Sequence, residues 1–171
     1  HDQEEALTMS DRIAVMEHAR VAQLGTPAEI YESPRTAFVA QFIGESNFLE
    51  GTAARHMGES WEVVHGGGSF RIPDHPALRQ GHAVQIAVRP EWMTLYPPQS
   101  VPPNVNALAG RIRDLVYLGQ TVQVIVDIPA AGDIRVALRN EGQLTRPLPW
   151  KRGDSAVVAW QPEDCQILEQ R

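Results

Sequence analysis

The pattern of hydrophobic and polar positions changes character near Asn47. Before this residue, short patterns of both kinds alternate: they predict a helix over residues 2–10, a strand over 12–17 and its hairpin partner over 21–24. After it, the patterns predict strands and turns without a long helix. The chain is therefore expected to have a small α+β part followed by a larger, mainly β part.

Two short helices are predicted to end the first part. Thr26, Pro27 and Glu29 form a capping box with proline at the first helical position, which predicts a helix start. A second helix is predicted over about 36–43, where apolar residues recur at four-residue spacing. The hairpin turn at 17–20 contains no glycine, so we expect a loop longer than, or different in shape from, a type I′ turn.

Alternating apolar positions predict strands in the second part, most clearly over residues 84–88, 122–128 and 133–139. Thirteen glycines and thirteen prolines, many of them in short clusters, indicate frequent turns. Short strands joined by such turns are typical of a small closed or nearly closed β-barrel. No repeat of fixed period is visible, which argues against a propeller.

The composition of the chain bears on its partners, on disulfide bonds and on insertion into a membrane. The net charge of −6 disfavours a nucleic-acid partner, because a basic surface is needed to displace counterions from phosphates. The single cysteine, Cys165, excludes an internal disulfide and suits a reducing compartment. No apolar run has the length that a bilayer-spanning helix needs, and the acidic start of the chain does not predict a signal peptide.

Four segments of the sequence, residues 1–12, 25–44, 88–91 and 117–121, carry a family resemblance. Together they resemble the C-terminal part of ABC importer ATPase subunits, and the nearest likeness is to the spermidine/putrescine subgroup. Segments 1–12 and 25–44 resemble the end of the nucleotide-binding domain. Segments 88–91 and 117–121 resemble the appended TOBE regulatory domain. The resemblance implies a mainly β fold: an OB-like TOBE β-barrel over residues 47–171, preceded by a small α+β remnant of an ABC ATPase domain over residues 1–46.

The resemblance also implies roles for particular residues. His1 would be the switch histidine that contacts the γ-phosphate of ATP in the intact parent, although a lone histidine is more often a solvated surface residue. Arg89, Glu91, Tyr117 and Gly119 are candidates for regulatory or dimer contacts. For Arg89 and Glu91 a structural alternative stays open, namely an ordinary ion pair or turn clamp. The spacing of the histidines and the cysteine predicts no metal site.

The phosphate-binding loop of such ATPases is not in this sequence. That loop requires a lysine followed by serine or threonine, and the only lysine, Lys151, lies between Trp150 and Arg152. We therefore expect that this chain does not hydrolyse ATP by itself. ATP and Mg²⁺ are the cofactors implied for the intact parent, and none is expected for the fragment.

The resemblance implies the regulatory, C-terminal part of an ATP-hydrolysing importer subunit, with polyamines as the candidate solute. Its implied partners are a second copy of itself and the transporter's membrane subunits, on the cytoplasmic face of the bacterial plasma membrane. The alternative is a stand-alone OB-like sensor of a polyamine or an oxyanion. Segment 1–44 favours the ATPase, because a sensor needs neither a switch histidine nor a capped helix after a Gly-Thr-Pro sequence.

Overall fold

The computed structural model describes residues 3–66, 68–129, 131–142 and 147–169. Its first part, which we call the N-terminal unit, comprises residues 3–46. It contains two strands that form a hairpin and three short helices: α1 (Gln3–Met9), β1 (Ile13–Glu17), β2 (Arg20–Gly25), α2 (Pro27–Glu32) and α3 (Ala37–Ile43). Among the described residues, none of the helices combines the length and the apolar character needed to cross a membrane.

Side-chain caps define the two helices that lie next to the barrel. The hydroxyl of Thr26 accepts a hydrogen bond from the Glu29 amide at 3.3 Å, and the Glu29 carboxylate accepts one from the Thr26 amide at 2.8 Å, so the predicted capping box is confirmed. Thr36 caps α3 in the same way, through the amide of Val39. These caps fix short helices that would be marginal in isolation.

The hairpin turn differs from the sequence-based expectation. Glu17 pairs directly with Arg20, so the turn has only His18 and Ala19 at its centre, and both have positive φ, 48° and 60°. The expectation of a longer loop was therefore wrong. A register shift between Val15 and Met16 accompanies the turn. The left-handed conformation of two non-glycine residues costs about 1 kcal/mol or more each, which the strand pairing has to offset.

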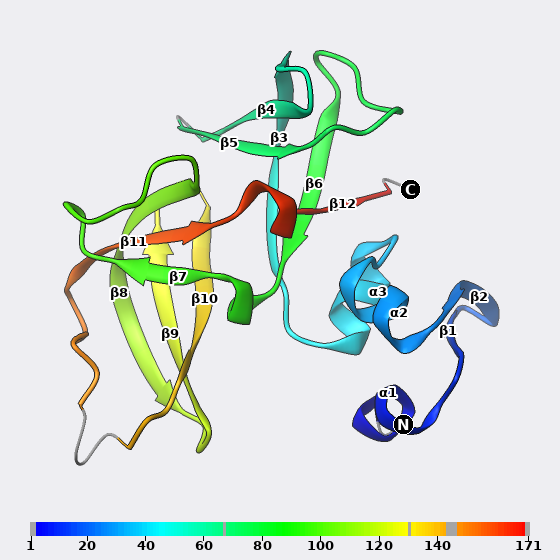
Figure 1. The fold of residues 1–171 in the computed structure, drawn as a ribbon, viewed down its shortest axis with the longest axis horizontal. Helices are drawn as coiled ribbons and strands as arrows, with labels where there is room; N and C mark the ends of the chain where they lie inside the picture. Colours follow the sequence, from blue (N-terminus) through cyan, green and yellow to red (C-terminus); the bar gives the residue numbers. More distant parts are fainter. Residues whose placement is uncertain (1–2, 67, 130, 143–146, 170–171) are drawn as a thin grey trace.

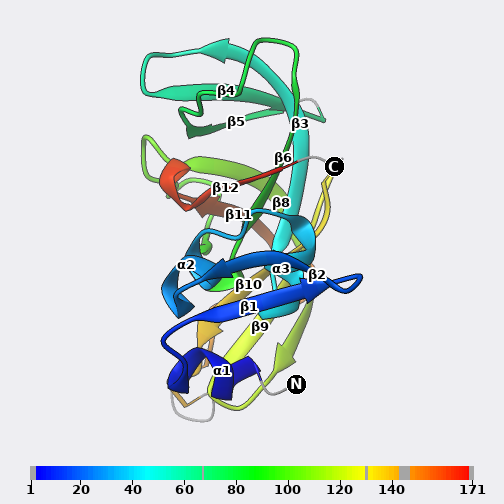
Figure 2. The same ribbon diagram turned by 90° about the vertical axis from the view of Figure 1, so that its right-hand side faces the viewer.

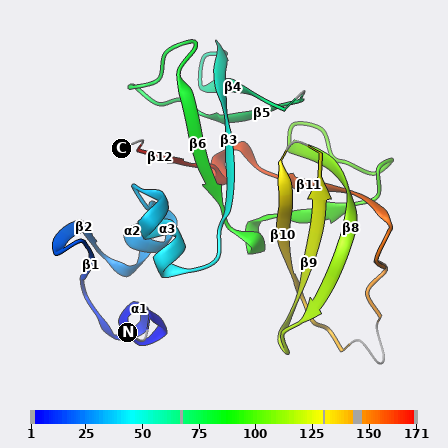
Figure 3. The same cartoon turned by 180° about the vertical axis from the view of Figure 1, so that it is seen from behind.

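Ten strands form two five-stranded antiparallel sheets (Figures 1 and 3). The first sheet has the order β12-β6-β3-β4-β5 and the second the order β7-β11-β8-β9-β10. The mainly β fold is confirmed. The strands are β3 (Asn47–His56), β4 (Ser60–His65), β5 (Gly68–Pro73), β6 (Ala83–Val88), β7 (Thr94–Tyr96), β8 (Asn106–Tyr117), β9 (Thr121–Ile128), β10 (Gly132–Arg139), β11 (Ser155–Trp160) and β12 (Gln166–Leu168).

The order of the strands reveals an internal repeat. Strands β3–β7 form the first repeat and β8–β12 the second, and each repeat leaves its own sheet after its fourth strand through a 3₁₀ turn, η1 (Pro90–Trp92) or η2 (Pro162–Asp164). The fifth strand of each repeat then pairs with the fourth strand of the other repeat, β7 with β11 and β12 with β6. The two sheets are therefore interlocked by exchanged strands.

Local geometry repeats as well. The turns after β3 and β8 each have three residues with a glycine of positive φ in the middle, Gly58 at 87° and Gly119 at 80°. The first strand of each repeat is bulged, between Ala53 and Arg55 and between Ile112 and Asp114. These matching irregularities show that the two repeats share one backbone design.

Two equivalent asparagines tie each repeat to the other. The Asn47 side chain accepts from the amide of Arg135 at 2.8 Å and donates to its carbonyl at 2.7 Å. The Asn106 side chain makes the same pair of bonds with Arg71, both at 2.7 Å. Each asparagine thus serves the backbone of the edge strand of the opposite sheet, and one continuous hydrophobic core lies between the sheets.

Asn106→Ala is expected to lower the free energy of unfolding by about 2–3 kcal/mol, because both backbone groups of Arg71 lose their partner. Chemical denaturation measures this loss. Asn47→Ala provides the matched comparison and should cost a similar amount. A much smaller effect at both positions would contradict the view that these side chains tie the two repeats together.

Candidate regulatory junction

The N-terminal unit packs against the outer face of the first sheet (Figures 1 and 2). A small apolar cluster forms this contact: Ala40 of α3, Ala87 of β6 and Leu168 of β12 are all buried. Because two of the three side chains are alanines, the helix approaches the sheet closely. This junction brings one of the sequence-predicted candidates into a fully buried position.

Arg89 lies at the centre of the junction and has no exposed surface. Its Nη1 donates to the Ala40 carbonyl at 3.0 Å, and also to the Glu45 carbonyl and the Ser46 hydroxyl; its Nη2 donates to the Tyr31 carbonyl at 3.0 Å. Burial lowers the pKa of Arg89. A guanidinium stays protonated in proteins, so these are charge-assisted hydrogen bonds from the end of β6 to three points of the N-terminal unit.

Tyr31 of α2 stands between the two charges of the Arg89-Pro90-Glu91 sequence. The Arg89 guanidinium carbon lies 4.4 Å from the centre of the Tyr31 ring, a cation–π contact. The Tyr31 hydroxyl donates to the Glu91 carboxylate. Burial, and then the bond to Glu91, raise the pKa of Tyr31 to about 12. The motif thus surrounds a tyrosine of the N-terminal unit.

The C-terminal strand supplies a further set of contacts. The Gln166 amide Nε2 donates to the carbonyl of Glu32 at 2.8 Å and to that of Tyr31 at 3.5 Å, at the end of α2. The backbone amide of Glu169 donates to the Arg35 carbonyl at 2.7 Å. Carbonyls at the end of a helix need such external donors, and β12 and β6 provide them together.

The raised pKa of Tyr31 predicts how the stability of the protein depends on pH. Its folded-state pKa lies above the value of about 10 expected in the unfolded chain, so its contribution to stability is complete below pH 10 and is lost as the pH rises toward 12. Ultraviolet titration of phenolate formation should show one ionisation near pH 12 that Tyr31→Phe removes. An unchanged titration curve in the variant would contradict the buried, Glu91-bonded hydroxyl.

The other sequence-predicted candidates lie elsewhere. Tyr117 ends β8 and Gly119 lies in the turn between β8 and β9, in the second sheet, and the structure does not bring them to Arg89. The Asn140 amide donates to the Tyr117 hydroxyl and to the Gly119 carbonyl, both at 2.6 Å. Tyr117 is 61% exposed and its neighbour Leu118 57%, so this turn presents an apolar surface. His1 lies outside the described residues.

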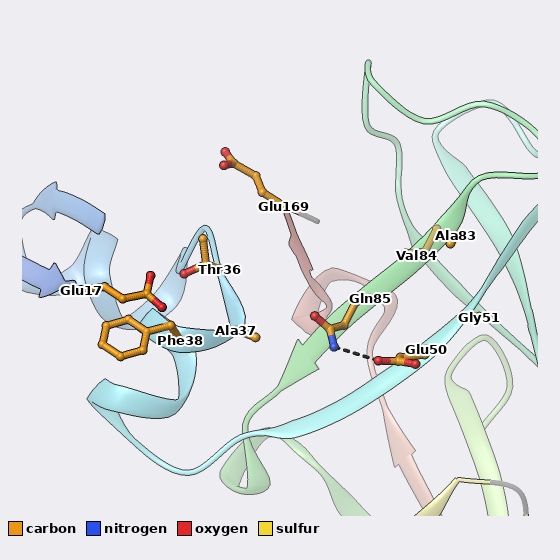
Figure 4. A pocket seen from close by; sticks show the side chains of 10 residues that line it. All are labelled: Glu17, Thr36, Ala37, Phe38, Glu50, Gly51, Ala83, Val84, Gln85 and Glu169. Carbon is orange, nitrogen blue, oxygen red and sulfur yellow. Dashed lines mark hydrogen bonds between the residues drawn. The ribbon is translucent and has the colours of Figure 1, made fainter. Parts of the chain in front are cut away.

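An acidic hollow of about 440 Å³ lies beside the junction (Figure 4). Glu17 of the hairpin, Glu50 of β3 and Glu169 line it, together with the ring of Phe38. The Glu50 carboxylate accepts a hydrogen bond from Gln85 at 2.9 Å. Carboxylates favour cations over anions here, and no group of three potential metal ligands occurs among the described residues.

Sequence reasoning did not identify Tyr31, Gln166 or Ser46 as members of the junction. Tyr31 occurs within the resembling segment 25–44, yet nothing in its local pattern indicates a partner 58 residues away. Gln166 begins a three-residue strand that is too short for a periodicity signal. Pairing of β3 with β6 brings Ser46 to Arg89, and the strand exchange brings Gln166 to the same junction.

Comparison with known proteins agrees with this fold. A model of the TOBE domain matches residues 86–168. The chain is 42% identical to the spermidine/putrescine import ATP-binding protein PotA of Thermobifida fusca over 169 residues, which are 98% of this chain and 43% of that protein. PotA of Rubrobacter xylanophilus is 40% identical, over 98% of this chain and 43% of the relative. The chain therefore spans less than half the length of these relatives.

A likeness to a solved structure concerns the fold alone. The cytoplasmic molybdate-binding protein ModG, in a form with molybdate bound, superposes with a TM-score of 0.58 at 18% identity, covering 71% of this chain and 94% of ModG. The sequence matches have a higher identity and cover more of this chain. Residues 86–168 of the chain match a TOBE domain, and nearly the whole chain is similar to a part, less than half, of two import ATP-binding proteins.

Proposed function

We propose that this chain is the C-terminal, regulatory part of the ATP-hydrolysing subunit of an importer that powers solute uptake, with polyamines as the solute. The identity of about 40% to import ATP-binding proteins named for spermidine and putrescine, over 98% of the chain, carries this proposal. Residues 1–46 are the end of the nucleotide-binding domain and residues 47–171 the TOBE barrel. The start of β3 at Asn47 supports this division.

In this proposal the chemistry belongs to the intact parent. ATP and Mg²⁺ bind there, His1 contacts the γ-phosphate, and the phosphate-binding loop lies in the part of the relatives that this chain does not span. The chain alone hydrolyses no ATP and needs no cofactor. It works on the cytoplasmic face of the bacterial plasma membrane, with the transporter's membrane subunits and a second copy of itself as partners and no nucleic acid.

Regulation acts through the junction. The barrel holds the N-terminal unit by buried and partly buried hydrogen bonds from Arg89 and Gln166, so a change in the barrel alters the support of α2 and α3. Glu91 takes part through Tyr31. Tyr117 and Gly119, at the exposed apolar turn of the second sheet, are the contacts proposed for the second copy.

A chimaera tests the transport function. The corresponding segment of Thermobifida fusca PotA is replaced by this chain, and uptake of labelled spermidine and putrescine is measured in cells without their own importer. Uptake should be restored by the chimaera and abolished by His1→Ala. Lack of uptake by a well-expressed chimaera, or ATP hydrolysis by the 171-residue chain alone, would contradict the proposal.

Self-association is tested separately by light scattering of the chain at high concentration. The chain should form dimers, and Tyr117→Ser together with Leu118→Ser should weaken them. Val64→Ser, at another exposed apolar side chain, serves as the control. A chain that stays monomeric at every concentration would exclude the barrel as a dimer contact.

A second candidate function is a small-ligand sensor. The acidic hollow at Glu17, Glu50 and Glu169 favours a polyamine over an oxyanion, as does the net charge of −6. Calorimetric titration with spermidine and with molybdate distinguishes the two ligands. Binding of spermidine that Glu50→Gln weakens would support a sensor. Binding heat with molybdate but none with spermidine would exclude this hollow as a polyamine-binding site.

A further inference from the structure

The last described residues of the chain, 166–169, form a segment that we call the C-terminal strap. Gln166 and Leu168 point to the outer face of the first sheet, two residues apart on the same strand. Gln166 bonds to the end of α2, Leu168 packs on Ala40 of α3, and the Glu169 amide bonds to the segment between these helices. The strap therefore touches the N-terminal unit at three places.

The strap is also part of the second repeat. It continues from β11 through η2, and β11 pairs with β8 over six residue pairs in the second sheet. Its own pairing with β6 covers only three residues. Its course is therefore set at one end by the second sheet, while its side chains hold the N-terminal unit at the other.

The internal repeat provides a comparison within the same molecule. Strand β7 occupies in the second sheet the place that β12 occupies in the first: Thr94 pairs with Ala159 as Gln166 pairs with Ala87. Thr94 is exposed, whereas Gln166 is only 8% exposed. The same strand position thus meets solvent in one sheet and the N-terminal unit in the other.

The amide of Gln166 is an energetically unfavourable way to make an ordinary packing contact. Its oxygen Oε1 is buried and has no hydrogen-bond partner among the described residues. A buried polar atom without a partner lowers the stability of the folded state, a cost that an apolar side chain of similar size avoids. What the amide adds over such a side chain is its pair of donated bonds to the end of α2.

We propose that the C-terminal strap is a mechanical link through which a change in the second sheet reaches the helices of the N-terminal unit, with Gln166 as its positioning residue. The inference rests on the proposed function, since it names the route by which the barrel would regulate. Other contacts also reach the first part of the chain from the second sheet. The exposed bond from Gln123 to Glu45 and the Asn47–Arg135 pair meet the chain at the start of β3, outside α2 and α3. The turn η1, which contacts β10, reaches α2 through the bond between Glu91 and Tyr31.

Hydrogen exchange in the 171-residue chain tests whether the strap stabilises α2 and α3. The reporters are the amides of Ser33 and Ala40, which bond to carbonyls inside α2 and at the start of α3. Gln166→Met, which keeps the length of the side chain, should speed their exchange roughly fivefold. Thr94→Met is the matched control and should leave both rates unchanged. Equal effects of the two substitutions would overturn the proposal.

A double-mutant cycle tests transmission. Leu115→Ala weakens the packing of β8 in the second sheet and should speed exchange at Ser33 and Ala40 while the strap is intact. When Gln166→Met and Leu168→Ala are both present, Leu115→Ala should have no further effect on these amides. An undiminished effect would show that the signal passes through Glu45, Asn47 or η1 instead and would overturn the proposal.

The strap variants are used in this test only if the amides of β8 and β9 keep their protection from exchange. If the variant that combines Gln166→Met with Leu168→Ala unfolds, Gln166→Met is used alone. Because exchange requires neither ATP nor transport, its outcome is independent of the chimaera. If the double-mutant cycle shows coupling through the strap but the chimaera fails to restore uptake, the proposed function is rejected. The proposal that the strap is a mechanical link then still stands.

Discussion

Replacing Arg89 with leucine is expected to lower the free energy of unfolding by about 3–5 kcal/mol, a large share of the 5–15 kcal/mol typical of a domain. The substitution removes the guanidinium donors from three carbonyls: the buried one of Ala40 and the partly buried ones of Tyr31 and Glu45. It also removes the cation–π contact with Tyr31. The loss should concentrate at the N-terminal unit, because all the lost bonds end there.

The internal repeat supplies the control for this prediction. Gln161 precedes η2 as Arg89 precedes η1, and it is exposed. Gln161→Leu should therefore change stability by less than about 1 kcal/mol. Urea unfolding followed by circular dichroism measures both variants. Similar midpoints for the two variants would show that the buried guanidinium does not hold the junction. Arg89→Lys should recover only part of the loss, since an ammonium cannot reproduce the fork of donors.

Gly110→Ala is expected to lower the free energy of unfolding by about 2–3 kcal/mol, the cost of forcing atoms into a closely packed site. A Cβ atom at Gly110 would lie 2.5 Å from the carbonyl oxygen of Asp127 and 2.6 Å from the Ile128 side chain. Backbone on the facing strand cannot yield as a flexible side chain does, so β8 and β9 must separate there.

Two other glycines test the reasoning behind this prediction. Gly51 holds the equivalent place in β3, where a Cβ would lie 2.6 Å from the Val64 carbonyl oxygen, and Gly51→Ala should cost about as much. At Gly68 the nearest atom would be 3.8 Å away, so Gly68→Ala should be neutral or stabilise by up to about 1 kcal/mol. Urea midpoints at an unchanged m-value give the comparison. Equal losses at Gly68 and Gly110 would contradict the steric explanation.

Elements that carry their own start and stop signals were predictable from the sequence. The Thr26 capping box and the apolar alternation of β9 and β10 depend on neighbouring residues only, and the structure confirms them. The hairpin turn was mispredicted because glycine is preferred in a type I′ turn without being required. The preference for glycine in such a turn is overridden where strand pairing on both sides fixes the conformation of the turn.

The internal repeat could not be found by searching for a period. Asn47 and Asn106 are 59 residues apart in the sequence, whereas Pro90 and Pro162 are 72 apart. The spacing changes because β8, β9 and β10 are each longer than β3, β4 and β5, and because the connection from β10 to β11 is longer than the one from β5 to β6. Arg89 was singled out by its motif, but its partners come from segments that only the folded chain brings together.

The exchange of the fifth strands also affects the order in which this protein can be completed during synthesis. The first sheet lacks β12 until residues 166–168 leave the ribosome, although its other four strands were made long before. Until then, the edge of β6 and the carbonyl of Glu32 at the end of α2 are without the partners that β12 supplies. The nascent chain thus carries an unprotected strand edge throughout the synthesis of the second repeat, and the first sheet is finished by the last strand of that repeat.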